Sequence, residues 1–283
     1  MNGSELRGAM WKQVKGRRVF LLIALFITLI PSMAQNLVLT GGGVTIPAFF
    51  GNPFLILTNL LTFGLCKIAL GQVEGEEKRF GGLFFFLKDG LFGKALILSL
   101  VLWLVNTAFT VLPNLLQQYG VDMMAQAATL ETLESGIQNI VVNDQTLYAQ
   151  GNIFNSLGML LNLACGFMGA VLLFPIQYRF ALRPKEPVMD QLAEGVALGW
   201  KYFWRVLGYR FLVNLPMGIL FVAYVSTTIF TTQLTLFIMV SVAVLYCYYQ
   251  PYVVLAEAAL AKKLFTIEET APKSWDTGRR LKG

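Results

Sequence analysis

Six apolar stretches dominate this chain, and a helix needs about 20 residues of this kind to cross a lipid bilayer. They occupy residues 19–39, 54–70, 94–116, 153–178, 206–230 and 236–256. Of the 283 residues, 56% are hydrophobic and only 13% are charged, whereas a soluble domain carries about 25% charged residues. The sequence therefore predicts an all-α, polytopic membrane helix bundle with about six transmembrane helices.

The lysines and arginines sort these stretches into an orientation. All 22 of them lie in four segments, which are residues 1–18, 66–94, 178–210 and 257–283. The other segments between the predicted spans contain none. Positively charged residues that flank membrane spans stay on the cytoplasmic side. The pattern therefore predicts that both termini and both basic connectors between spans are cytoplasmic.

Three regions follow from this reading. Residues 1–18 form a basic cytoplasmic arm, residues 19–256 form the six-span domain, and residues 257–283 form a charged cytoplasmic tail. We expect the tail to be partly disordered. The longest polar segment, residues 117–152, is predicted to be an outer loop. Its part at residues 123–140 has a composition that permits a short helix over the outer face.

The first apolar stretch has a second interpretation. Residues 19–30 followed by Ser32-Met33-Ala34 also resemble a signal peptide with an A-x-A-like cleavage site. Apolar residues resume at 37–39, which makes the stretch long enough to span the bilayer with some tilt. Retention as the first span is therefore favoured, and cleavage is the alternative.

The second basic connector is predicted to hold a helix, residues 187–205, that lies in the membrane surface. One helical face carries Met189, Leu192, Val196, Trp200 and Phe203, and the other carries Gln191, Glu194, Lys201 and Arg205. Such a helix buries its apolar face at the acyl boundary and keeps its charges in water. The predicted interfacial anchor consists of Trp200, Lys201, Phe203, Trp204 and Arg205. The alternative is an ordinary soluble amphipathic helix. The first connector has a weaker amphipathic stripe at residues 80–91.

The polar residues inside the predicted spans are mainly asparagines. They are Asn59, Asn106, Asn155, Asn162 and Asn214, and no Asp or Glu lies at mid-membrane depth. In the fourth span, asparagine and glycine alternate along one helical face from residue 155 to residue 169. Small residues let membrane helices approach closely, and amides form hydrogen bonds across the contact. A packing contact between helices is the favoured interpretation, and a polar path for a substrate is the alternative.

No catalytic site can be recognised in the sequence. The chain lacks histidine, its three cysteines (Cys66, Cys165 and Cys247) are far apart, and no nucleophile or phosphate-binding motif is present. We therefore expect no enzyme activity, no cofactor and no metal site. The basic segments flank spans, so the expected partner is a bilayer with anionic inner-leaflet lipids and not a nucleic acid. A membrane-protein partner or a homo-oligomer remains open.

A weak internal repeat links the two basic connectors. Ala69-Leu70, Glu74 and Lys88 recur as Ala181-Leu182, Glu186 and Lys201, at an offset of 112 to 113 residues. Each copy would comprise a span, a cytoplasmic amphipathic connector and a second span, in a parallel repeat. Chance similarity between apolar segments is an equally good explanation.

Several short motifs resemble those of an uncharacterised family of bacterial polytopic membrane proteins, which is defined only as a domain of unknown function. These motifs are Gly71 and Glu74, Leu102-Trp103, Leu112-Pro113, Tyr178, Glu186, Ala193, Trp200-Lys201, Phe203, Pro251-Tyr252, Ala256 and Ala259. The chain departs from the family pattern at Pro113-Asn114, where the family has Pro-Gly, and in the long loop 117–152. The resemblance implies a multi-pass protein of the bacterial inner membrane and transfers no active site.

Two functions are compatible with these features. The first is an accessory, scaffold or channel-like component of the inner membrane. The alternative is a transporter or permease-type subunit for a small polar or amphipathic solute.

Overall fold

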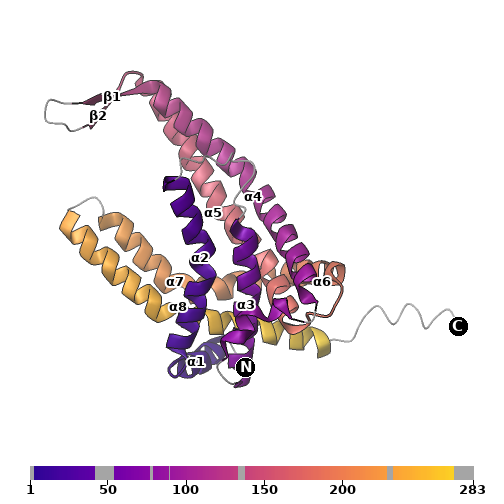
Figure 1. Cartoon of the computed structure of the whole chain (residues 1–283). Coiled ribbons are helices and arrows are strands. Elements are labelled where there is room, and N and C mark those ends of the chain that lie inside the picture. The colour runs from indigo at the N-terminus through magenta and orange to yellow at the C-terminus, as the bar shows by residue number, and fades with distance from the viewer. Residues whose placement is uncertain are drawn as a thin grey trace. The chain divides into compact units, whose positions relative to one another are not determined.

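The chain is almost entirely helical in the computed structural model (Figure 1), which describes residues 3–41, 54–76, 79–88, 90–132, 138–227 and 232–270. The helices are α1 (Gly3–Val14), α2 (Arg18–Gly41), α3 (Phe54–Glu74), α4 (Leu91–Ala127), α5 (Gln145–Leu182), α6 (Val188–Lys201), α7 (Phe203–Thr227) and α8 (Thr232–Thr270). A 3-10 segment, η2 (Phe80–Leu87), precedes α4, and strands β1 (Ala128–Thr132) and β2 (Gln138–Val142) separate α4 from α5. The predicted all-α class is confirmed. Residues 42–53, between α2 and α3, lie outside the described residues.

Three helices in the described part of the chain, α3, α4 and α5, are long and apolar enough to cross a membrane. Within the most apolar 18-residue stretch, only 28% of α4 and 22% of α5 is buried. Monomeric soluble proteins rarely leave an apolar surface of this extent exposed. The exposed surfaces of these helices are therefore compatible with a membrane protein.

The chain divides into two compact units. Unit 1 comprises residues 1–29, 61–92 and 175–283, and unit 2 comprises residues 30–60 and 93–174. Every lysine and arginine except Lys94 belongs to unit 1. Unit 2 instead contains the acidic residues Asp122, Glu131, Glu134 and Asp144. The two units thus separate almost all lysines and arginines from the acidic residues of the segment 117–152.

Unit 1 has an aromatic core. Phe180 of α5 packs against Phe63 of α3 and Phe85 of η2, with ring centroids 4.9 and 5.6 Å apart. The basic N-terminal segment is a helix, α1, and its Trp11 contacts the ring of Tyr252 in α8 at 5.1 Å. The helix α1 packs against α8 (Figure 1), and residues 3–14 belong to unit 1.

The last helix continues beyond residue 256, the predicted end of the sixth span, because α8 runs to Thr270. Glu257 accepts a hydrogen bond from Arg210 Nε of α7 at 2.8 Å, and Lys262 pairs with Glu74 of α3 at 3.0 Å. Ala258 and Ala261 between them are fully buried. Glu257 and Lys262, which the sequence analysis assigned to the tail, therefore form ion pairs within unit 1. Residues 271–283 lie outside the described residues.

Unit 2 is built around the antiparallel contact of α4 and α5. Both helices extend well into the predicted loop 117–152, since α4 ends at Ala127 and α5 begins at Gln145. The separate helix expected at residues 123–140 is wrong, because this segment ends α4 and then forms the β1–β2 hairpin (Figure 1). The β-branched residues of the hairpin, such as Ile140, Val141 and Val142, favour strands over helix.

Candidate functional site

The amides of unit 2 take part in the contact between α4 and α5. Asn162 donates a hydrogen bond to the side-chain oxygen of Asn114 at 3.0 Å. One helical turn or more away, a Cβ atom added to Gly120 would lie 2.9 Å from Asn155 Cα and 2.5 Å from the Gly151 carbonyl oxygen. The backbones therefore touch, in the way that small residues allow between membrane helices.

The remaining asparagines bond to nearby backbone groups. Asn59 of α3 donates to the carbonyl of Ser99 in α4 at 3.4 Å, which also lies in unit 2. Asn214 belongs to unit 1 and donates to Arg210 of its own helix at 2.9 Å. The Asn106 backbone carbonyl accepts a hydrogen bond from Thr110 at 3.1 Å. Among the five asparagines, the side chains of Asn59 and Asn162 thus bond within unit 2, and that of Asn214 bonds within unit 1.

A cavity of about 530 Å³ lies beside Asn162. Its lining combines two amides, Gln117 and Asn162, with the apolar side chains of Met159, Leu163 and Phe167. Mixed linings of this kind are common where proteins bind amphipathic molecules.

The outward face of α6 is apolar. Trp200 is 71% exposed, and Met189 and Val196 are exposed on the same helix. The buried face carries Gln191, Gly195 and Leu198. A soluble protein normally buries the apolar stripe of an amphipathic helix, whereas this stripe of α6 is exposed.

The sequence placed Gln191 in water, and this assignment is wrong. Gln191 is fully buried. Its Nε2 donates to the carbonyl oxygens of Arg183 and Glu186 at 3.1 and 3.2 Å. These bonds close the turn between α5 and α6, where two carbonyls need donors. Helical periodicity cannot separate a buried capping amide from a solvated one.

The other residues of the predicted anchor surround the junction of α6 and α7. Trp204 is 79% exposed, and the half-buried ring of Phe203 packs between it and Trp200. Lys201 and Arg205 are both exposed. The structure therefore groups the five predicted anchor residues on one outer edge of unit 1.

An ion-pair cluster that the sequence did not predict joins the end of α5 to α6. The Arg179 side chain, only 6% exposed, contacts Glu186 at 2.9 Å and Glu194 at 2.5 Å. Arg183 also pairs with Glu186, at 3.1 Å. The cluster fastens the end of α5 to the connector and to α6. The only signal in the sequence was the recurrence of Glu74 as Glu186.

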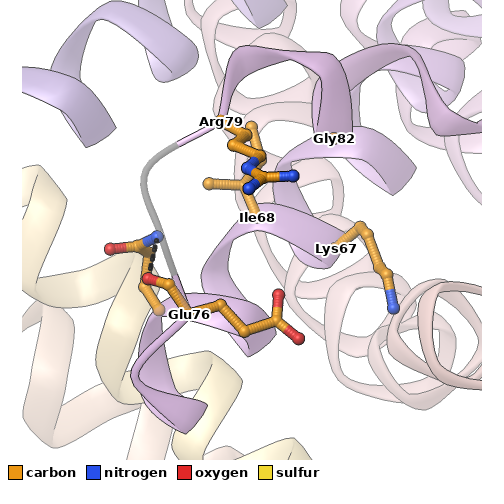
Figure 2. A pocket seen from close by; sticks show the side chains of 6 residues that line it. Lys67, Ile68, Glu76, Arg79 and Gly82 are labelled. Carbon is orange, nitrogen blue, oxygen red and sulfur yellow. Dashed lines mark hydrogen bonds between the residues drawn. The ribbon is translucent and has the colours of Figure 1, made fainter.

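A second charged site of unit 1, a cavity of about 450 Å³, lies where α3 meets the first connector (Figure 2). Its lining consists of Lys67, Ile68, Gln72, Glu76, Arg79 and Gly82. The dashed line in Figure 2 joins the Gln72 amide to the backbone carbonyl of Glu76, at 3.4 Å. Lys67 and Arg79 approach the cavity from α3 and from the connector, so it is lined by two cations.

In the described part of the chain, no group of three or more Cys, Asp or Glu side chains could hold a metal ion. No family model, curated protein or solved structure matches this chain.

Proposed function

We propose that this chain is an integral inner-membrane protein with six spans, α2, α3, α4, α5, α7 and α8, which serves as an accessory or scaffold component of a membrane assembly. The observation that carries the scaffold function is the hydrogen bond between Asn162 and Asn114 amid the glycine contacts of α4 and α5. Polar groups within the spans are used to join helices, and the outer surfaces remain apolar.

The six-span topology is supported by the concentration of lysine and arginine in unit 1. In this topology, both termini and both connectors are cytoplasmic. The exposed stripe of α6 then lies in the inner leaflet, with Trp200 and Trp204 at headgroup depth.

Reporter fusions test this topology. An enzyme that is active only outside the cytoplasm should be active when fused after Gln126 or Thr232. It should be inactive after Arg79, Lys185 or Lys273. Activity after Lys185 would contradict the six-span topology, because that residue lies in the second basic connector.

Thiol accessibility separates a scaffold from a transporter. In a background without the three native cysteines, Asn106→Cys, Asn162→Cys and Asn214→Cys should resist a water-soluble thiol reagent, because a dry helix contact excludes it. Gln126→Cys, at an exposed position of α4, serves as the reactive control. Rapid labelling of the three positions would show a hydrated path and contradict the scaffold function.

The second candidate function is binding or transport of an amphipathic solute at the cavity beside Asn162, which offers both amides and apolar side chains. Labelling of Asn162→Cys alone, slowed by such a solute, would favour this function over the scaffold.

A further inference from the structure

The structure extends the sequence repeat to a pair of contacting residues. At the offset of 112 that relates Glu74 to Glu186, Gly64 and Leu83 correspond to Ile176 and Gly195. Both pairs are in contact. A Cβ atom on Gly64 would lie 2.6 Å from Leu83 Cα, and one on Gly195 would lie 2.5 Å from Ile176 Cγ1. A contact between a helix and the connector that follows it thus occurs at the same position in both copies. The glycine belongs to the helix in the first copy and to the connector in the second.

Burial agrees with this correspondence. Ala69 and Ala181 are both fully buried, and Phe84 and Val196 are 44% and 46% exposed. The connectors differ in their local helix type, since the first is a 3-10 segment and the second is α6. The first connector has two adjacent glycines, Gly81 and Gly82, and glycine disfavours the α-helix. We therefore compare the charged residues of the two copies position by position.

In the second copy, Arg179 is neutralised by two carboxylates. Glu186 lies in the turn after α5, and Glu194 lies one helical turn or more along α6. In the first copy, Lys67 occupies the position of Arg179, and Gly82 occupies the position of Glu194. The equivalent of Glu186, Glu74, pairs instead with Lys262 of α8 at 3.0 Å.

Lys67 consequently lacks both carboxylates that its counterpart has. Among the described residues, none forms a hydrogen bond or ion pair with the Lys67 ammonium group. At this place the structure has the cavity of about 450 Å³ shown in Figure 2. Gly82, which stands in place of Glu194, and Lys67 thus both line this cavity.

The described lining of the cavity carries more cations than carboxylates. Arg79 lines it as a second cation, and Glu76 is its one carboxylate among the described lining residues. The Glu76 carboxylate lies against the backbone of Gly71, which has no Cβ atom to exclude it. An anion that enters the cavity therefore meets two cations and one carboxylate.

We propose that this cavity binds a phosphate group, whose oxygens take the place that the Glu194 carboxylate has beside Arg179. Lysine binds phosphate as a point charge, and arginine adds directed N–H donors. The phosphate belongs either to an anionic lipid headgroup or to a small phosphate compound in solution. Only the lipid source depends on the proposed membrane topology, since free phosphate can be tested in detergent.

The experiment measures the thermal unfolding midpoint of the full chain under two conditions. In phosphatidylcholine nanodiscs, phosphatidylglycerol is added to test a lipid headgroup, and in detergent, inorganic phosphate is titrated to test a free ion. The chain should be stabilised by at least one of them. Lys67→Gln should raise the half-saturating concentration about tenfold, since a charged hydrogen bond is lost. Gly82→Glu should abolish the stabilisation by supplying the missing carboxylate.

Two variants serve as controls. Gly82→Ala adds the Cβ atom, which would lie 3.0 Å from Ile68 Cγ1, without adding a charge, and should keep binding. Lys12→Gln removes an exposed lysine of α1 outside the cavity and should also keep binding. Stabilisation by phosphatidylglycerol alone supports the site and identifies a lipid headgroup. The proposal is overturned if neither phosphatidylglycerol nor phosphate stabilises the chain. It is also overturned if Lys12→Gln and Lys67→Gln weaken this stabilisation equally.

Discussion

Replacement of Gly64 by alanine is expected to destabilise unit 1 by about 3 kcal/mol, the upper part of the range for overpacked cores. The added Cβ atom would overlap the carbonyl group of Leu83 and would lie 2.6 Å from its Cα. Backbone atoms cannot rotate away as a side chain can, so α3 and the connector would have to separate. The unfolding midpoint of the full chain in detergent measures the effect.

The matched control is Gly208→Ala in α7, where an added Cβ atom has no neighbour within 4 Å. It should be neutral, or stabilising by up to about 1 kcal/mol, because alanine favours the helix. The repeat provides a sharper comparison. Gly195→Ala clashes mainly with the Ile176 side chain and should be partly rescued by Ile176→Ala. Leu83→Ala should not rescue Gly64→Ala, and rescue there would contradict the backbone contact.

The apolar stretches predicted the helices well, because a helix in lipid must carry apolar residues along its whole length. The ends of the helices were harder to predict. The sequence ended the last stretch where charges begin, yet Glu257 and Lys262 continue α8 because each has an oppositely charged partner on another helix. Such partners are distant in sequence, and no local pattern reveals them.

The candidate site residues differ in how local their signals are. The aromatic anchor rests on a row of Trp and Phe beside a basic connector, which is a local signal, and its place in the membrane surface stays a prediction. The hydrogen bond between Asn162 and Asn114 and the cavity beside Lys67 depend on packing between segments, so composition cannot reveal them. The offset of 112 residues between Glu74 and Glu186 can be found in the sequence. The same offset places Gly82 opposite Glu194, so the first copy lacks a carboxylate at this position.

Neutralisation of Glu186 should destabilise the chain more than neutralisation of Glu194. The Arg179 side chain is 6% exposed, so a lost partner leaves a buried charge poorly compensated. Removal of one partner of a buried ion pair costs about 3–5 kcal/mol, because the other charge is left uncompensated. Glu186 is 27% exposed and accepts from both Arg179 Nε, at 3.0 Å, and Arg183. We expect Glu186→Gln to cost about 2–3 kcal/mol, because Glu194 still compensates part of the charge.

Glu194 is 60% exposed, and its pairing with Arg179 is weakened by water, so Glu194→Gln should cost about 1 kcal/mol or less. The control is Glu74→Gln, the equivalent position in the first copy, where the pair with Lys262 is about 40% exposed on both sides. It should also cost about 1 kcal/mol or less. The double variant Arg179→Leu/Glu186→Leu should be more stable than Glu186→Gln, because it removes the buried charge together with its partner. Equal losses in Glu186→Gln and Glu194→Gln would instead mean that water reaches Arg179 and that α6 is held to α5 by its apolar contacts alone.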